Sequence, residues 1–326
     1  MSMCERGKRI VCVGTLIQDM FPTRRGAGLI EQEAFIPAPG GAIGNVAVAA
    51  ARMGAGASVA AKVGNDVFGR NIRNVLAAEG VNTENVILDG NARTTMNFHA
   101  VLPGGDIEYC FYRNPGADTR LRFEEISSDF LDNAAFVHFD SLAFSDEPFR
   151  SACLEIIRRC KERGIPVSLD GNFRDAIWAG DAWNRLMEEI LPFFDILKLN
   201  LAELQLLYPA LTLESGMSSA AEKGVRLILV TDGEKGAHAS FQGKILTSGG
   251  FQVSAVDTIG CGDAFIGAFL ARMAGISADF SDIQEDALLS ALSVANAAAA
   301  LTATKKGALT AIPQKDEVVK LSGVEF

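Results

Sequence analysis

The segment 257–263 (DTIGCGD) combines two glycines with carboxylates directly before an apolar helical pattern. Gly260 and Gly262 allow a tight turn and let a ligand approach the main chain closely. The first N–H groups of a helix lack partners inside it, and together with the helix dipole they favour an anion such as phosphate. Asp263 could then accept the proton of a hydroxyl that attacks phosphorus. Asp is also a common helix N-cap, but the density of specified residues favours a phosphoryl-transfer centre over a plain cap.

Further polar residues follow predicted strands in four distant parts of the chain. They are Asp19; Asp170 with Asn172 and Arg174; Asn200 with Glu203; and Thr231 with Gly233. In an open parallel sheet, ligands bind outside the carboxyl ends of the strands. These side chains are therefore expected to converge on one crevice.

Short β-branched runs alternate with longer helical patterns along the chain. The predicted strands are 10–15, 57–64, 84–89, 136–141, 166–170, 196–200, 227–232 and the hairpin 237–248, and the predicted helices are 44–53, 67–79, 146–163, 181–190, 201–208, 216–223, 263–274 and 283–303. This alternation predicts an α/β fold with a mostly parallel central sheet and helices on both faces. Segments of about 16–37 and 94–113 break the rhythm, the second as a hairpin around 103–106, and should form a small β lid. We expect one domain, 1–326.

Composition narrows the class of protein. With 326 residues, 48% of them hydrophobic and 21% charged, the chain can bury a sizeable core. A net charge of −10 without a basic run argues against a nucleic-acid partner. The six cysteines (4, 12, 110, 153, 160 and 261) lack Cys-x-x-Cys spacing, which fits a reducing compartment. The apolar runs 10–17 and 287–303 are too short or too interrupted for a signal peptide or a membrane span, so we expect a cytoplasmic protein.

Several catalytic motifs are missing from the sequence. It has no G-x-x-x-x-G-K-[ST], G-x-G-x-x-G, H-E-x-x-H or G-x-S-x-G. This excludes P-loop NTPases, ordinary dinucleotide dehydrogenases, zincins and α/β-hydrolases. His99, His138 and His238 are too dispersed for a metal cluster and are expected to pack on or near strands.

Two more glycine segments, 40–45 (GGAIGN) and 64–69 (GNDVFG), each precede a predicted helix. In this order, with 257–263 far downstream, they resemble the ribokinase-like carbohydrate kinases of the PfkB family. The resemblance spans nearly the whole chain, from Val13-Gly14 to 311–313. It implies ATP-dependent phosphorylation of a sugar-like alcohol with Mg²⁺.

The resemblance also implies roles for single residues. Asp263 corresponds to the base, and the backbone of Gly260, Cys261 and Gly262 to the anion hole. Arg174, which follows two polar residues at a strand end, is counted with the catalytic residues. The remaining site residues fall into three groups: Asp19, Gly41, Asn45, Arg113 and Asp170 on the sugar side; Asn200, Thr231, Gly233, Gly236 and Asn296 at the nucleotide; and Glu203 with Asn200 organising Mg²⁺, through water.

The substrate follows from two segments that resemble the fructokinase branch, 111–118 (FYRNPGAD) and 170–174 (DGNFR) with Trp178. They imply fructose with attack by its 6-hydroxyl. Because 2-keto-3-deoxygluconate kinases share the second pattern, that substrate stays open, as do ribose and nucleosides. A regulator that binds sugar or nucleotide without turnover is the alternative of another class. Relatives often dimerise through the lid, so we expect a homodimer.

Four residues keep two interpretations each. Lys198 could approach phosphate or close a strand end, and Asp257 could cap its own turn or help to hold a monovalent cation such as K⁺. Arg113 could lie near the sugar or only end an amphipathic strand. Cys261 stands where relatives usually have alanine. It is either an inert small residue or a redox-sensitive thiol whose pKa the helix N-terminus lowers.

Overall fold

The computed structural model describes residues 8–104, 106–276 and 283–326. Over these residues, nine strands form one sheet in the order β13-β12-β11-β10-β9-β8-β1-β4-β5. The strands are β1 Arg9–Val13, β4 Gly56–Gly64, β5 Asn82–Asp89, β8 Ala134–Asp140, β9 Val167–Asp170, β10 Ile196–Asn200, β11 Leu227–Thr231, β12 Ala237–Phe241 and β13 Lys244–Ser248. All neighbouring pairs from β11 to β5 are parallel, whereas β12 and β13 are antiparallel additions at one edge. The predicted α/β fold is confirmed.

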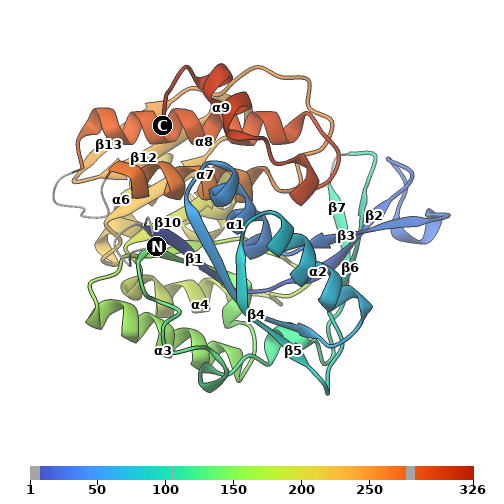
Figure 1. Ribbon diagram of the computed structural model, residues 1–326. Helices are drawn as coiled ribbons and strands as arrows, with labels where there is room; N and C mark the ends of the chain where they lie inside the picture. The colour runs from blue at the N-terminus through green and yellow to red at the C-terminus, as the bar shows by residue number, and fades with distance from the viewer. Residues whose placement is uncertain (1–7, 105, 277–282) are drawn as a thin grey trace.

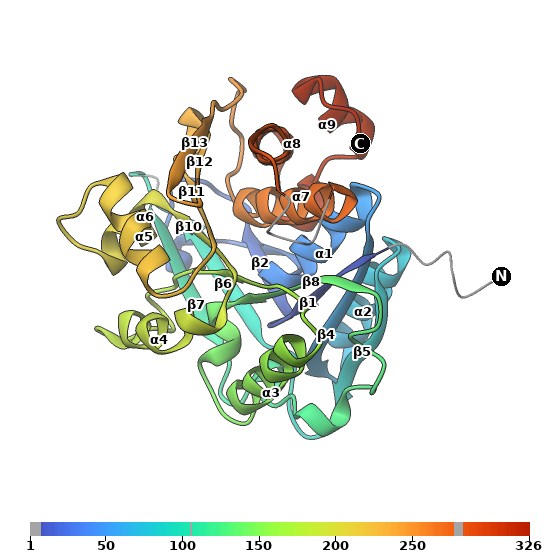
Figure 2. The same cartoon turned by 90° about the vertical axis from the view of Figure 1, so that its left-hand side faces the viewer.

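Helices cover both faces of this sheet, as Figures 1 and 2 show. One face carries α1 Ala42–Arg52, α2 Val67–Ala78, α7 Cys261–Ile276, α8 Glu285–Ala303 and α9 Lys315–Ser322. The other carries α3 Phe149–Glu162, α4 Ala182–Ile190, α5 Leu201–Leu207 and α6 Leu213–Glu222. In β1, Ile10 and Cys12 pack with the first group, and Val11 and Val13 with the second. Successive strand side chains point to opposite faces, so a continuous apolar run can fill both layers.

A second sheet stands beside the first, to the right in Figure 1. Its order is β3-β2-β6-β7, built from β2 Ile17–Pro22, β3 Phe35–Gly40, β6 Met96–Val101 and β7 Ile107–Tyr112. These strands come from the two segments expected to form a lid. β6 and β7 pair antiparallel around the predicted turn, of which Gly105 lies outside the described residues.

Some boundaries differ from the sequence prediction for local reasons. α6 begins three residues earlier than predicted because the Thr212 hydroxyl accepts a hydrogen bond from the Ser215 N–H. α3 begins later than predicted, at Phe149, directly after Pro148. α9 was not predicted, and its short amphipathic pattern buries Val318. α8 could span a membrane by length and composition alone, but 56% of its most apolar window is buried inside the protein.

Candidate active site

Two cavities meet at the turn that precedes α7. The first, of about 320 Å³, lies between the lid sheet and the carboxyl ends of β9 and β10, and Asp19, Asn45 and Asp263 are among its lining residues. The second, of about 290 Å³, lies beyond the end of β11 and includes Thr231 in its lining. Thr258 and Gly262 line both cavities. The 257–263 turn is therefore the wall that the two compartments share.

Asp263 lies in the first turn of α7 and faces the first cavity. The preceding Gly260 has a φ of +82°, and an added Cβ there would approach the Ala308 Cα to 3.0 Å, so this turn favours glycine. Asn45 Nδ2 donates to Asp263 Oδ2 at 2.8 Å, which ties α1 to α7. Burial raises the pKa of Asp263 to about 6, and Asp170 acts in the same direction. A carboxylate with a pKa near 6 is ionised at neutral pH and is still a competent proton acceptor.

A buried ion pair lies beside this turn. Lys198 Nζ is 2.9 Å from Asp170 Oδ2, and both side chains are almost fully buried. Burial opposes the charge of Lys198, but Asp170 and Glu203 outweigh it and raise the pKa of the ammonium group. An added Cβ on Gly262 would lie 2.7 Å from Lys198 Nζ. The ammonium group therefore sits against the glycine backbone, where it can attract phosphate as well as hold the strand end.

The N-terminal part of the chain closes the first cavity. Gly41 has a φ of +98°, and an added Cβ would lie 2.3 Å from the Thr15 carbonyl oxygen, so only glycine fits. Asp19 Oδ1 accepts a hydrogen bond from Asn97 Nδ2 at 2.9 Å. Burial raises the pKa of Asp19 to about 6, although this hydrogen bond opposes the shift. The wall offers mainly acceptor atoms, which suit a ligand with several hydroxyls.

Arg174 brings a positive charge to the same cavity. Its Nη1 donates to the Phe173 carbonyl oxygen at 2.7 Å, and its guanidinium lies 5.5 Å from the centre of the Tyr109 ring. A half-buried guanidinium over an aromatic face is held by a cation–π contact. The remaining N–H groups of Arg174 are thus oriented by the lid strand β7.

The second cavity contains four predicted nucleotide residues and Cys261. They are Thr231, Gly233, Gly236 and Asn296. Gly236 has a φ of +101°, and an added Cβ would lie 2.1 Å from the Ser248 carbonyl oxygen. Asn296 Nδ2 donates to that same oxygen at 3.0 Å. This cavity is more apolar than the first, and a mainly apolar lining with a few polar groups is typical of small-molecule and cofactor sites.

Known proteins share this architecture. The sequence matches the pfkB family carbohydrate kinase profile over residues 8–315. The chain belongs to this carbohydrate kinase family. It is 38% identical to Fructokinase-1 of Oryza sativa subsp. japonica over 98% of this chain and 99% of that protein, and 37% identical to Fructokinase-1 of Zea mays over 96% and 97%.

Solved fructokinase structures superpose on nearly the whole kinase. A Vibrio cholerae O395 fructokinase double mutant with fructose, ADP and potassium bound is 30% identical, with a TM-score of 0.87, over 96% of this chain and 98% of that one. The ATP-bound Xylella fastidiosa fructokinase is 30% identical, with a TM-score of 0.88, over 96% and 97%. The same V. cholerae enzyme has also been solved with calcium. This chain is therefore a sugar kinase of the pfkB family.

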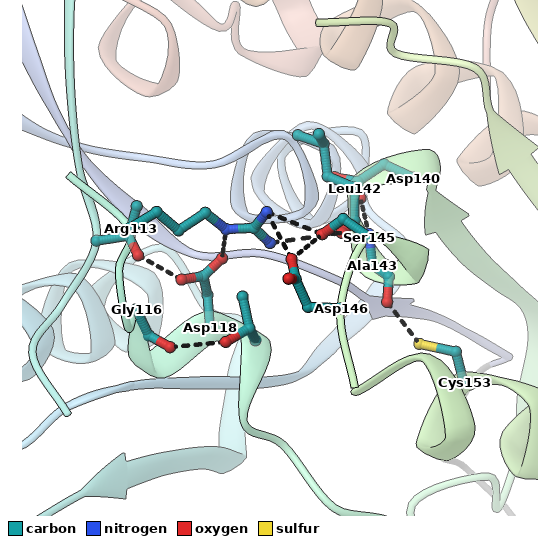
Figure 3. A network of polar contacts seen from close by, with 11 residues as sticks. Arg113, Gly116, Asp118, Asp140, Leu142, Ala143, Ser145, Asp146 and Cys153 are labelled. Atoms are coloured by element: carbon teal, nitrogen blue, oxygen red, sulfur yellow. Dashed lines mark hydrogen bonds and ion pairs between the residues drawn. The ribbon is translucent and has the colours of Figure 1, made fainter. Parts of the chain in front are cut away.

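Arg113 does not take the position that the sequence suggested. Its Nε lies 2.7 Å from Asp118 Oδ2 and its Nη1 donates to Ser145 Oγ at 2.8 Å (Figure 3). With its guanidinium held there, Arg113 is not among the residues that line the first cavity, which we call the sugar cavity. Asp118 is 1% exposed, and a carboxylate that is buried so deeply needs a cationic partner. In this kinase Arg113 fastens the lid to the loop after β8 instead of lining the cavity.

Asn200 and Glu203 hold each other at the start of α5. Glu203 Oε2 accepts from the Asn200 N–H and Asn200 Oδ1 accepts from the Glu203 N–H, both at 2.8 Å. Glu203 Oε1 also accepts from the Phe173 N–H at 2.9 Å. Both residues line the first cavity, whereas Asn200 was expected at the nucleotide. Among the described residues no three His, Cys, Asp or Glu side chains form a metal cluster.

Asp170, Asp257 and Cys261 are also more constrained than predicted. Asp170 lines the sugar cavity, but its carboxylate already accepts a hydrogen bond from Lys198 Nζ. Asp257 accepts from the Ile259 N–H at 3.1 Å and the Gly307 N–H at 3.2 Å, so it caps its own turn. Burial, with Asp257 and Asp263, raises the pKa of Cys261 to about 12. This raised pKa favours the inert small residue over the redox-sensitive thiol.

Two lid residues in the cavity wall, Asn97 and His99, were not identified from the sequence. Their i, i+2 spacing on a predicted strand placed them on one face. The sequence alone does not show whether that face meets solvent, core or ligand, and His99 was expected only to pack near a strand.

Proposed function

We propose that this chain is an ATP-dependent fructokinase that transfers the γ-phosphoryl group of ATP to the 6-hydroxyl of fructose. One observation carries the proposal: a polar cavity and a nucleotide-type cavity adjoin at Thr258 and Gly262, with Asp263 facing the polar one. Phosphoryl transfer depends chiefly on in-line positioning and on neutralising charge at oxygen. The names of the rice, maize and V. cholerae relatives support fructose.

The reaction follows from this arrangement. Fructose lies in the first cavity with its reacting hydroxyl at Asp263, and ATP lies in the second with its γ-phosphate at the shared turn. Asp263 takes the hydroxyl proton as that oxygen forms a bond to the γ-phosphorus and the bond to the ADP oxygen breaks. The N–H groups at the start of α7 and the Lys198 ammonium neutralise charge on the transferring group. Mg²⁺, when bound, neutralises the ATP phosphates, and Glu203 with Asn200 would orient its water ligands.

Arg174 favours one second candidate. A guanidinium in the sugar cavity suits the carboxylate of 2-keto-3-deoxygluconate, which fructose lacks. Against this, the acceptor-rich wall of Asp19 and Asn97 favours hydroxyl groups.

A coupled ADP-release assay over fructose, 2-keto-3-deoxygluconate, ribose and nucleosides tests the proposal. We expect fructose to give the highest kcat/KM and ³¹P NMR to identify the 6-phosphate. A higher kcat/KM with another acceptor would replace the substrate. Sugar binding without ADP release for any acceptor would establish the regulator.

We also propose that the kinase works as one unit, 1–326, and pairs with a second copy through the lid. β3 and β7 are the edges of the lid sheet, and Ile36 on β3 and Tyr112 on β7 expose 59% and 67% of their surfaces. Ile30, in the 3₁₀ turn Leu29–Glu31 between β2 and β3, is 98% exposed. Edge strands with exposed apolar side chains invite pairing. Sedimentation should give twice the 34.7 kDa chain mass, and Ile30→Glu with Ile36→Glu should give monomers. A wild-type monomer at micromolar concentration would refute the pairing.

A further inference from the structure

The lid strand β6 buries polar atoms that no protein group satisfies. His99 is 2% exposed, and neither of its ring nitrogens has a hydrogen-bond partner among the described residues. Asn97, two positions earlier on the same face, is 5% exposed, and its Oδ1 is likewise unpartnered. Leaving such groups unpaired costs folding free energy, and native proteins seldom do so without a ligand or water to satisfy them.

Both side chains belong to the wall of the sugar cavity. The His99 ring packs edge-on against Phe21, with centroids 4.7 Å apart and planes at 86°, so the imidazole is held in place. His99 also lines a neighbouring, mainly apolar cavity of about 410 Å³ that Phe21, Ile36 and Ile259 help to enclose. The imidazole therefore separates the sugar cavity from an apolar space beneath the lid.

The protonation state of His99 suits an uncharged polar ligand. Burial lowers the pKa of His99 to about 4, although Asp257 acts in the opposite direction. At neutral pH the ring is neutral, so one nitrogen donates and the other accepts. A sugar hydroxyl, which also donates and accepts, matches such a group better than a carboxylate or an aliphatic surface does.

Asn97 is oriented by Asp19. Because its Nδ2 donates to Asp19 Oδ1, its own Oδ1 is left as an acceptor. Asn45 already holds Asp263, so the reacting hydroxyl occupies that end of the cavity. The β6 pair is left to contact other parts of the sugar.

We propose that His99 and Asn97 Oδ1 hydrogen-bond sugar hydroxyls other than the one that is phosphorylated, and thereby select the sugar. The inference rests on the proposed sugar-kinase function and deepens it. A site built to pair a substrate hydroxyl discriminates against the analogue that lacks it, because its own buried polar groups are then left unpaired.

The test compares the best acceptor with those of its monodeoxy analogues that keep the reacting hydroxyl, in the wild type, His99→Leu, His99→Gln and Asn97→Ala. We expect at least one analogue to lose about 10- to 100-fold in wild-type kcat/KM. His99→Leu should lower kcat/KM for the parent sugar by a similar factor but change the matching deoxy analogue less than about threefold. His99→Gln, which can still donate and accept, should recover part of the loss. His238→Leu is the matched control, because His238 lies on β12, contacts Thr247 and lines neither cavity.

Each outcome decides the inference. Equal losses for the parent and every analogue would indicate a purely structural role and overturn it. The inference would also be overturned if the wild type had the same kcat/KM for all these monodeoxy analogues as for the parent sugar. That comparison does not depend on any variant folding. If another sugar exceeds fructose, the substrate proposal fails, and the same comparison proceeds with that sugar's analogues. If calorimetry detects no sugar binding at all, both proposals fail.

Discussion

Asp263→Asn separates catalysis from stability in one substitution. The amide is nearly isosteric with the carboxylate and can still accept the hydrogen bond from Asn45 Nδ2. It then presents an NH₂ donor where the sugar hydroxyl needs an acceptor. We expect kcat to fall by about 10²–10⁴-fold, since this is the usual contribution of a positioned base, whereas ATP binding in the second cavity should change little.

The same change should stabilise the sugar-free protein. The folded-state pKa of Asp263 is about 6, against an ordinary value of 3.8. Because the folded state binds the proton more tightly, stability is lost as the pH rises from about 4 to 6. One pKa unit corresponds to about 1.4 kcal/mol, so the charged carboxylate costs at most about 3 kcal/mol above pH 7. Asp263→Asn should remove that cost at pH 8 and much less of it at pH 4.5.

Two assays follow this prediction. ADP release over pH 5–9 should show a wild-type kcat/KM that falls below pH about 6, with the residual rate of Asp263→Asn lacking that limb. Urea unfolding at pH 8 and pH 4.5 should show the stability gain at the higher pH. Asp132→Asn is the control, because Asp132 forms an exposed pair with Arg163. Near-normal turnover of Asp263→Asn would remove Asp263 from the role of base, and unchanged stability would show that its charge is not strained.

Three further changes test the turn and its surroundings. Lys198→Met leaves the buried Asp170 carboxylate unpaired, so urea unfolding should show a loss of about 3–5 kcal/mol, which the added change Asp170→Asn should partly restore. Gly260→Ala places an alanine at a positive φ and in close contact with Ala308. Urea unfolding should show a loss of about 1–3 kcal/mol from this strain, and kcat should fall. Full activity of this variant would contradict the need for glycine. Because burial keeps Cys261 protonated, mild peroxide should leave activity equal in wild type and Cys261→Ala, and selective loss in the wild type would restore the redox interpretation.

The sequence by itself determined the architecture and the reacting end of the site. Strand and helix periods differ, so alternating patterns imply a parallel sheet with two helical layers. Polar residues after parallel strands must gather at one edge, which is why Asp170, Asn200 and Thr231 were expected in one crevice. The structure places them at that edge but divides them between two cavities, with Asp170 and Asn200 in the first and Thr231 in the second. The 257–263 turn depends on local backbone geometry, and the positions of its glycines indicate that geometry because glycine permits backbone angles that other residues rarely adopt.

Only the tertiary structure decided which partner each side chain meets. Arg113 turns to Asp118 and Ser145, because the fold buries Asp118 and brings the loop after β8 to the lid. The tertiary structure likewise placed His99 and Asn97 in the wall of the sugar cavity. The strand pattern shows that these two residues share a face, but not what lies opposite that face. Which group a side chain contacts depends on how segments far apart in the chain come together. A turn or a helix start depends mainly on residues next to it in the sequence. The phosphoryl-transfer turn could therefore be predicted from 257–263, while the β6 wall, which we propose selects the sugar, could not.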